Sequence, residues 1–138
     1  KKIEVMEKEN VKVLLAEIAN NQGVISIGQK DVDRFKASVD EMDGEKVSGR
    51  IDEIGVILNN VLSLIRKRNA GKRIQGLLFV IRLPQVNSFM EHINEVHDVI
   101  DKLGDELECQ WGLSTKEILQ GGQCECLVAV GFRSVVRC

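Results

Sequence analysis

Two carboxylates, Asp31 and Asp33, are the first side chains in the sequence whose types and spacing could support acid–base chemistry. They belong to segment 23–35, in which the apolar residues show no helical period and Gly28 interrupts the run. Paired acids can transfer protons to and from a reacting group, which is general acid–base catalysis. The structural alternative is that Asp31 caps one short helical turn, because loop aspartates commonly accept hydrogen bonds from nearby backbone N–H groups.

Among the cysteines, Cys124 and Cys126 lie two residues apart in a strand-like run and therefore share one face. Such a pair could bind a metal or undergo redox chemistry, but two small apolar side chains in a core show the same pattern. A chain of 138 residues, 43% of them hydrophobic, needs no disulfides to fold. We therefore expect reduced thiols in a cytoplasmic protein.

Segment 66–73 is a basic cluster that could bind phosphate or an acidic partner. It also falls where cations stabilise the C-terminus of a predicted helix, and it has no interleaved aromatic residues, so a solvated helix end is favoured. His92 and His97 belong to another predicted helix. At their spacing they point about 140° apart, so they cannot bind one metal ion from that helix.

A buried strand is predicted at Ile74–Pro84, where branched and aromatic residues are bounded by glycine and proline. Other helices and strands follow from apolar periodicity. The helices are expected at residues 1–20, 51–65 and 88–103, and the strands at residues 36–46, 107–113 and 124–132. Ser48 is a candidate N-cap for the second helix, and Ser88 with Glu91 forms a capping box for the third.

This order of elements predicts an α+β fold, a two-layer sandwich in which a mixed four-stranded sheet carries two helices on one face. The strand–helix–strand unit from residue 74 to residue 113 favours a parallel pair with a right-handed crossover. The last two strands are joined by a loop of about ten residues, so we expect them to pair antiparallel. Segment 1–22 is expected to be the end of a long core helix that lies apart from the domain formed by residues 23–138.

Composition and motifs exclude several functional classes. Lysine and arginine total 19 against 21 acidic residues, so the net charge of −2 gives no electrostatic reason to expect nucleic acid or an anionic membrane as partner. No apolar run approaches the roughly 18 residues of a membrane-spanning helix. The sequence also lacks glycine-rich phosphate-binding motifs and paired C-x-x-C motifs, so we expect no cofactor and no metal in this chain.

Several local strings, in their shared order and spacing, resemble the C-terminal half of the tubulin/FtsZ superfamily, and are closer to bacterial FtsZ than to eukaryotic tubulin. Leu14–Phe35 looks like the end of the long central helix of that family and the loop that completes a neighbouring subunit's GTPase site. Ile74–Pro84 is similar to the strand usually written ARGVLVNITGG, and Leu127–Phe132 to the strand VTVIATGF. The helices of this resemblance are Arg50–Leu64 and Ser88–Leu103, and it spans residues 14–132 as a whole.

The resemblance implies a subunit that stacks head to tail into filaments, with its loop beside the nucleotide of its neighbour. The FtsZ loop commonly reads G-L-I-N-V-D-F-A-D-V, and residues 23–32 here read G-V-I-S-I-G-Q-K-D-V. Asp31 falls on the last carboxylate of that motif and is the candidate catalytic residue, acting in trans. Gly28 replaces the middle aspartate and Ser26 replaces the asparagine. The expected loop contacts are Ser26, Gly28, Gln29 and Asp33.

This departure implies a degenerate activating loop, because losing a positioned acid–base group typically slows a reaction by about 10²–10⁴. The chain alone is then not an enzyme, and the resemblance implies a full-length protein that binds GTP and Mg²⁺ and hydrolyses GTP slowly. The expected partners are further copies in filaments and regulatory proteins in the cytoplasm. Cell division, plasmid segregation and a regulatory paralogue are all open as roles.

The alternative is a stand-alone ferredoxin-like module that regulates or binds a small molecule, since fold does not fix function. A self-contained enzyme that uses Cys109, Cys124 or a histidine is a third hypothesis. A preceding domain with a glycine-rich phosphate loop would favour the assembly domain, whereas a natural start near Lys1 would favour the module.

Overall fold

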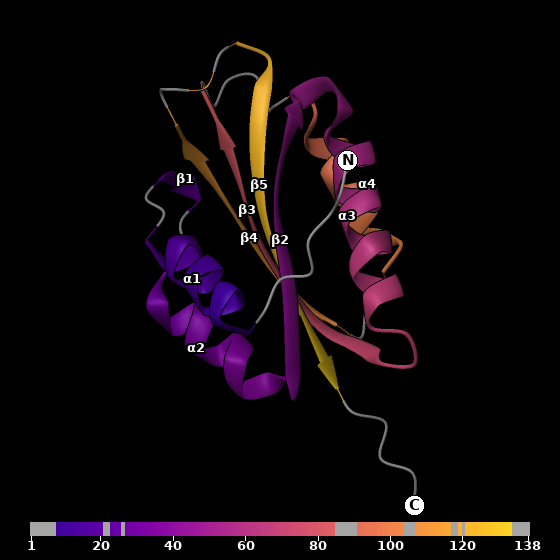
Figure 1. The fold of residues 1–138 in the computed structure, drawn as a ribbon. Helices are drawn as coiled ribbons and strands as arrows, with labels where there is room; N and C mark the ends of the chain where they lie inside the picture. Colours follow the sequence, from indigo (N-terminus) through magenta and orange to yellow (C-terminus); the bar gives the residue numbers. More distant parts are fainter. Residues whose placement is uncertain are drawn as a thin grey trace, which may run out of the picture.

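The computed structural model describes residues 8–20, 23–25, 27–84, 91–103, 107–116, 119 and 121–133. The helices within these ranges are α1 (Lys8–Ala19), α2 (Gln29–Ser38), α3 (Ile54–Arg68) and α4 (Ile93–Asp101), with a 3₁₀ turn, η1, at Ile51–Glu53. The strands are β1 (Gly23–Ile25), β2 (Glu41–Arg50), β3 (Arg73–Leu83), β4 (Glu108–Thr115) and β5 (Gln123–Arg133). Figure 1 shows the sheet between two pairs of helices.

One mixed sheet contains all of these strands, in the order β1-β4-β3-β5-β2. The predicted mixed sheet of four strands is confirmed in β2 to β5, with β3 and β4 parallel, and β1 adds a short strand at the edge. The predicted pairing of the last two strands with each other is wrong. β5 lies between β3 and β2 and pairs antiparallel with both, because its nearly continuous apolar sequence suits an interior strand that is covered on both faces.

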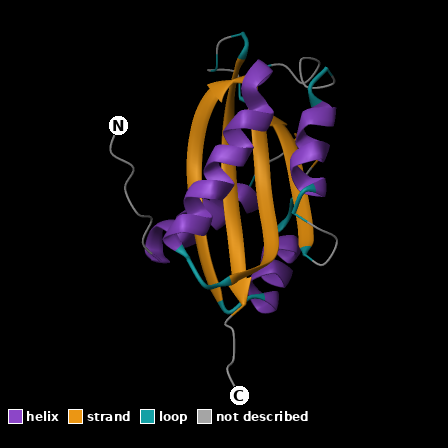
Figure 2. Ribbon diagram, turned by 90° about the vertical axis from the view of Figure 1, so that its right-hand side faces the viewer, coloured by secondary structure: helices purple, strands orange, loops and turns teal. Residues whose placement is uncertain are grey.

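Helices α3 and α4 pack over one face of the sheet, so the predicted α+β class and helix-covered sheet are confirmed. Figure 2, turned so that this side faces the viewer, shows both helices lying across the strands. The residues that the two helices bury in this core are Ile54, Leu58, Val61, Leu62, Ile65, Val96 and Val99. The predicted alternation in residues 107–113 is also confirmed. Leu113 is buried in this core, and Cys109 and Trp111 pack against the core.

The opposite face of the sheet is covered by α1 and α2 (Figure 1). The buried residues of this second core are Val11, Leu14, Leu15, Ile18, Ile27, Val32, Phe35, Leu78, Val80, Leu127 and Ala129. The expectation that the first helix lies apart is therefore wrong, because β3 and β5 present a second apolar face that its stripe covers. The contact is close at Gly44, where a Cβ would lie 2.5 Å from Leu14 Cδ2 and 2.8 Å from Val128 O.

Three local predictions differ from the structure. α2 has 10 residues and is not a single turn. The strand predicted at residues 36–46 lies at Glu41–Arg50, where it pairs with β5 along its whole length. Ser48 therefore lies in a strand and does not cap α3, which begins at Ile54 after η1. The expected cap at Ser88 lies outside the described residues, and α4 begins at Ile93.

An ion-pair network joins α1 to the sheet. Glu125 Oε1 accepts hydrogen bonds from Arg82 Nη1 at 2.9 Å and from Lys116 Nζ at 3.0 Å. On α1, Glu17 Oε1 accepts from Lys46 Nζ at 3.3 Å, and Glu17 Oε2 lies 3.6 Å from Arg82 Nη1. Burial alone would raise the pKa of Glu125, but the hydrogen bonds from Lys116 and Arg82 lower it below its usual value.

Candidate functional site

The segment predicted to act on a neighbour, residues 23–35, is attached to the fold on both sides of its polar residues. β1 pairs antiparallel with β4, with Gly23 opposite Ser114 and Ile25 opposite Leu113. Ile27 is only 2% exposed and packs in the core that α1 and α2 form with the sheet. α2 begins two residues after Ile27. The backbone that carries the polar side chains of its first turn is therefore held in place by the packed core.

Asp31 caps α2 from within the first turn of the helix. Its Oδ2 accepts a hydrogen bond from the Gly28 N–H at 3.0 Å, while the Asp31 N–H donates to the Gly28 carbonyl oxygen at 3.1 Å. In this reciprocal arrangement a carboxylate at the third helical position satisfies a backbone donor that would otherwise lack a partner. The structural alternative from the sequence, a capping role for Asp31, is thus observed, on a longer helix than expected.

The backbone conformation at position 28 does not require a glycine. Its φ of −101° is one that any residue adopts, and a Cβ there would meet nothing within 4 Å. A side chain therefore fits where the FtsZ loop has its middle aspartate. The fold therefore does not explain why this sequence lacks a carboxylate at position 28.

Gln29 and Asp33 lie one turn apart on the exposed side of α2, where Gln29 Nε2 donates to Asp33 Oδ1 at 2.9 Å. Four of the predicted residues, Gly28, Gln29, Asp31 and Asp33, thus gather at the start of α2, and Ser26 lies outside the described residues. Together they offer carboxylate oxygens and one amide. These groups can orient a water molecule or a polar neighbour, and none of the four is a thiol, hydroxyl or imidazole nucleophile.

The described cysteines belong to the core. Cys124 and Cys126 are fully buried on the side of the sheet that α3 and α4 cover, and a hydrogen bond between them, together with burial, raises the pKa of Cys126. Burial raises the pKa of Cys109 to about 11. Thiols that stay protonated, as Cys109 and Cys126 do, are poor nucleophiles and poor metal ligands. The hydrogen bond with Cys126 lowers the pKa of Cys124, but that side chain is fully buried. No group of three or more His, Cys, Asp or Glu in the described ranges could hold a metal ion, and Cys138 lies outside those ranges.

The two histidines make separate local contacts. His92 Nδ1 lies 2.9 Å from Glu95 Oε2, one turn along the chain. The His97 ring lies edge-on to Trp111, with 6.1 Å between the ring centroids, and Trp111 stacks on Phe79 at the same centroid distance. These contacts place Trp111 in an aromatic group at the edge of the core.

One residue of the basic cluster at residues 66–73 forms largely buried ion pairs that residue spacing could not reveal. Arg68, with its side chain only 12% exposed, donates two hydrogen bonds of 3.0 Å to the Asp43 carboxylate and one of 3.1 Å to Glu45 Oε1. Asn69 Nδ2 also donates to Asp43, at 2.8 Å. The acidic partners belong to β2, far from Arg68 in the sequence. Arg66, in contrast, is exposed at the helix end, as predicted.

None of the helices in the described part of the chain combines the length and apolar character needed to cross a membrane.

Solved structures show which fold this arrangement is. An FtsZ dimer from M. jannaschii matches with a TM-score of 0.58 and 16% identity, over 88% of this chain and 36% of that one. TubZ-Bt, in a helical model of a four-stranded filament, matches with a TM-score of 0.63 and 11% identity, over 92% of this chain and 34% of that one. The chain therefore has a tubulin/FtsZ-like fold and spans about a third of the length of these proteins. No protein-family model and no curated protein matches the sequence.

Proposed function

We propose that this chain is the C-terminal assembly domain of an FtsZ/TubZ-like filament protein whose subunits associate head to tail. The observation that carries the proposal is the fold that it shares with an FtsZ dimer and with TubZ-Bt from a filament. Fold alone does not fix function. Separate support comes from the segment at the start of α2, where Asp31 falls on the last carboxylate of the FtsZ loop motif. A stand-alone ferredoxin-like module is not favoured by these similarities.

The surface that would meet the neighbouring subunit is the start of α2. Gln29 and Asp33 are exposed, whereas Val32 and Phe35 are buried beneath them. The helix thus presents a polar, well-supported surface. In the proposed filament, Asp31 would act in trans beside the nucleotide bound by the next subunit.

We further propose that the full-length protein hydrolyses GTP slowly. GTP and Mg²⁺ would be bound by a preceding domain, in which the metal would supply charge stabilisation for phosphoryl transfer. This chain would contribute the Asp31 carboxylate, which the Gly28 N–H holds in place. Because Gly28 has no side chain, one carboxylate is present where the FtsZ loop has two. A cytoplasmic location, regulatory protein partners and a role such as cell division belong to the same proposal.

The first test is the Asp31→Asn variant of the full-length protein. Asparagine keeps an oxygen for the Gly28 hydrogen bond and removes the negative charge, so folding and filament formation should persist. We expect GTP turnover to fall about tenfold or more, measured as phosphate release beside filament pelleting. The exposed Asp52 in η1 provides the control, since Asp52→Asn should leave turnover unchanged. Unchanged turnover in Asp31→Asn would remove its catalytic assignment, and a full-length protein that forms no filaments with GTP would refute the assembly role.

The second test restores the missing carboxylate with Gly28→Asp. The open space around Gly28 admits the side chain, so turnover should rise about tenfold or more if this group limits the reaction. Gly28→Asn is the matched control, because it has nearly the same shape without the charge. Equal turnover in these two variants would show that the missing carboxylate does not limit hydrolysis.

A further inference from the structure

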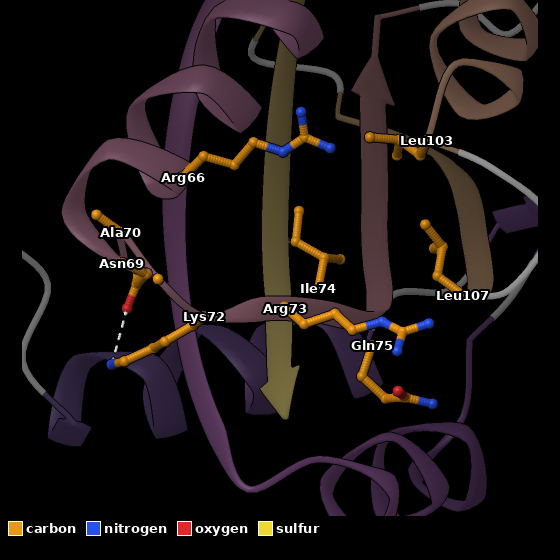
Figure 3. A pocket seen from close by; sticks show the side chains of 10 residues that line it. Arg66, Asn69, Ala70, Lys72, Arg73, Ile74, Gln75, Leu103 and Leu107 are labelled. Carbon is orange, nitrogen blue, oxygen red and sulfur yellow. Dashed lines mark hydrogen bonds between the residues drawn. The ribbon is translucent and has the colours of Figure 1, made fainter. Parts of the chain in front are cut away.

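A hollow of about 400 Å³ opens where α3 ends and the chain turns into β3, beside the end of α4 (Figure 3). Cationic and aliphatic side chains line it: Arg66, Lys72 and Arg73 with Ile74, Leu103 and Leu107. The described residues that line it include no acidic side chain. Concave sites of this size that combine apolar surface with a few charged groups are typical of ligand sites.

Arg66 is the side chain that most favours a negatively charged ligand. It is exposed and makes no side-chain hydrogen bond or ion pair within the described chain. Its near neighbour Arg68 is surrounded by carboxylates, and Lys72 pairs with Glu41 Oε2 at 3.0 Å. The Arg66 guanidinium can therefore bind an external carboxylate through two parallel hydrogen bonds without losing an internal partner.

The apolar part of the hollow lies next to these cations. In Figure 3 the side chains of Arg66 and Arg73 extend on either side of Ile74, toward the end of the hollow where Leu103 and Leu107 lie. The three aliphatic side chains are only partly buried, at the margin of the core beneath α3 and α4. A matching ligand carries an aliphatic group with a negative charge beside it, within reach of Arg66.

We propose that this hollow binds an acidic peptide segment of a partner protein, through one aliphatic side chain and a neighbouring carboxylate that Arg66 binds. The end of α3 disfavours a phosphate group, because a helix C-terminus carries partial negative charge and sites for phosphate use the N–H groups of helix N-termini or nests. A carboxylate bound by the long Arg66 side chain keeps its charge away from the helix carbonyls, whereas Lys72 and Arg73 already have partners within the chain. The site lies on the α3 and α4 side of the sheet and does not involve the start of α2.

Fluorescence anisotropy with the 138-residue chain tests the proposal. The probes are three fluorescein-labelled peptides in which one leucine is flanked by two glutamates at different spacings. We expect at least one to bind with a Kd below about 100 µM. Arg66→Glu should weaken binding tenfold or more, and Arg66→Gln should weaken it less. Lys67→Glu makes the same charge change in the same helical turn outside the hollow, so it should change Kd less than about twofold.

The apolar contact and the kind of ligand are tested with the same assay. A peptide with serine in place of leucine should bind several-fold more weakly. The proposal is overturned if no peptide binds below about 1 mM, or if Arg66→Glu and Lys67→Glu weaken binding equally, which would indicate general attraction to basic charge. Displacement of the peptide by millimolar inorganic phosphate would instead identify a small-anion site and also overturn it. Thermal melting by circular dichroism checks that every variant is folded.

Discussion

Replacing Arg68 by leucine should destabilise the fold by about 3 kcal/mol, because it leaves buried carboxylates without their counter-ion. Asp43 and Glu45 are 6% and 9% exposed, and Arg68 bonds to both. Breaking such a pair on one side typically costs about 3–5 kcal/mol. We expect the lower end because Asp43 keeps the Asn69 amide and the Gly44 N–H as donors, at 2.8 Å each, whereas Glu45 loses its one hydrogen-bond partner in the described chain.

Urea titration followed by circular dichroism and Trp111 fluorescence measures this change. With an m-value of about 2 kcal/mol/M, the midpoint should fall by about 1.5 M. Arg50→Leu is the control, because its 3.3 Å pair with Asp52 has side chains 67% and 55% exposed and should contribute less than about 0.5 kcal/mol. A loss below about 1 kcal/mol for Arg68→Leu would refute the reasoning. Adding Asp43→Asn and Glu45→Gln to Arg68→Leu should recover part of the loss, since these changes remove the uncompensated charges.

Three further predictions follow from contacts described above. Gly44→Ala should cost about 1–3 kcal/mol in urea unfolding, because its Cβ would collide with backbone as well as with a side chain of α1, whereas Gly28→Ala, whose Cβ meets open space, should cost less than about 0.5 kcal/mol. Cys109 should react with iodoacetamide at pH 8 about 100-fold more slowly than a thiol of ordinary pKa, with the rate rising toward pH 11; mass spectrometry reads this out, and equal rates would contradict its burial. The lowered pKa of Glu125 means that its stabilising contribution is present above its unfolded pKa of about 4.5 and is lost as pH falls through the folded value. Glu125→Gln should therefore lower Tm at pH 7 and have a smaller effect at pH 3, and an equal loss at both values would contradict the charge-based account.

The parts of the fold that local sequence determines were predictable. β3 combines a run of apolar residues with glycine and proline at its ends, and this pattern predicts a buried strand without knowledge of its partners. The parallel pairing of β3 with β4 follows from the helix between them. The alternation around Trp111 likewise specifies which face of β4 is buried.

The parts that depend on distant residues were not predictable. β2 contains the buried acids Asp43 and Glu45, so its sequence lacks the apolar pattern of a buried strand. These acids can be buried because Arg68 of α3 pairs with both of them. The position of β5 between β3 and β2 is likewise a property of the whole sheet.

At the candidate site, the cap made by Asp31 was one of the alternatives that the sequence left open, and the structure shows it. The space around Gly28 could not be inferred, because an absent side chain leaves no pattern in a sequence. What the start of α2 does for a neighbouring subunit depends on a second molecule, so it stays a proposal with the tests given above.

The place of β5 also limits when this protein can fold during its synthesis. β2 ends at residue 50, yet the strand that it pairs with begins at residue 123. A nascent chain must therefore be synthesised as far as residue 133 before β2 gains its neighbour along its whole length, and until then β3 presents an unpaired apolar edge. Such late, long-range pairing slows folding and exposes the chain to aggregation. We expect translation pauses or chaperone binding between these two strands to affect the yield of soluble protein more than changes in either strand alone.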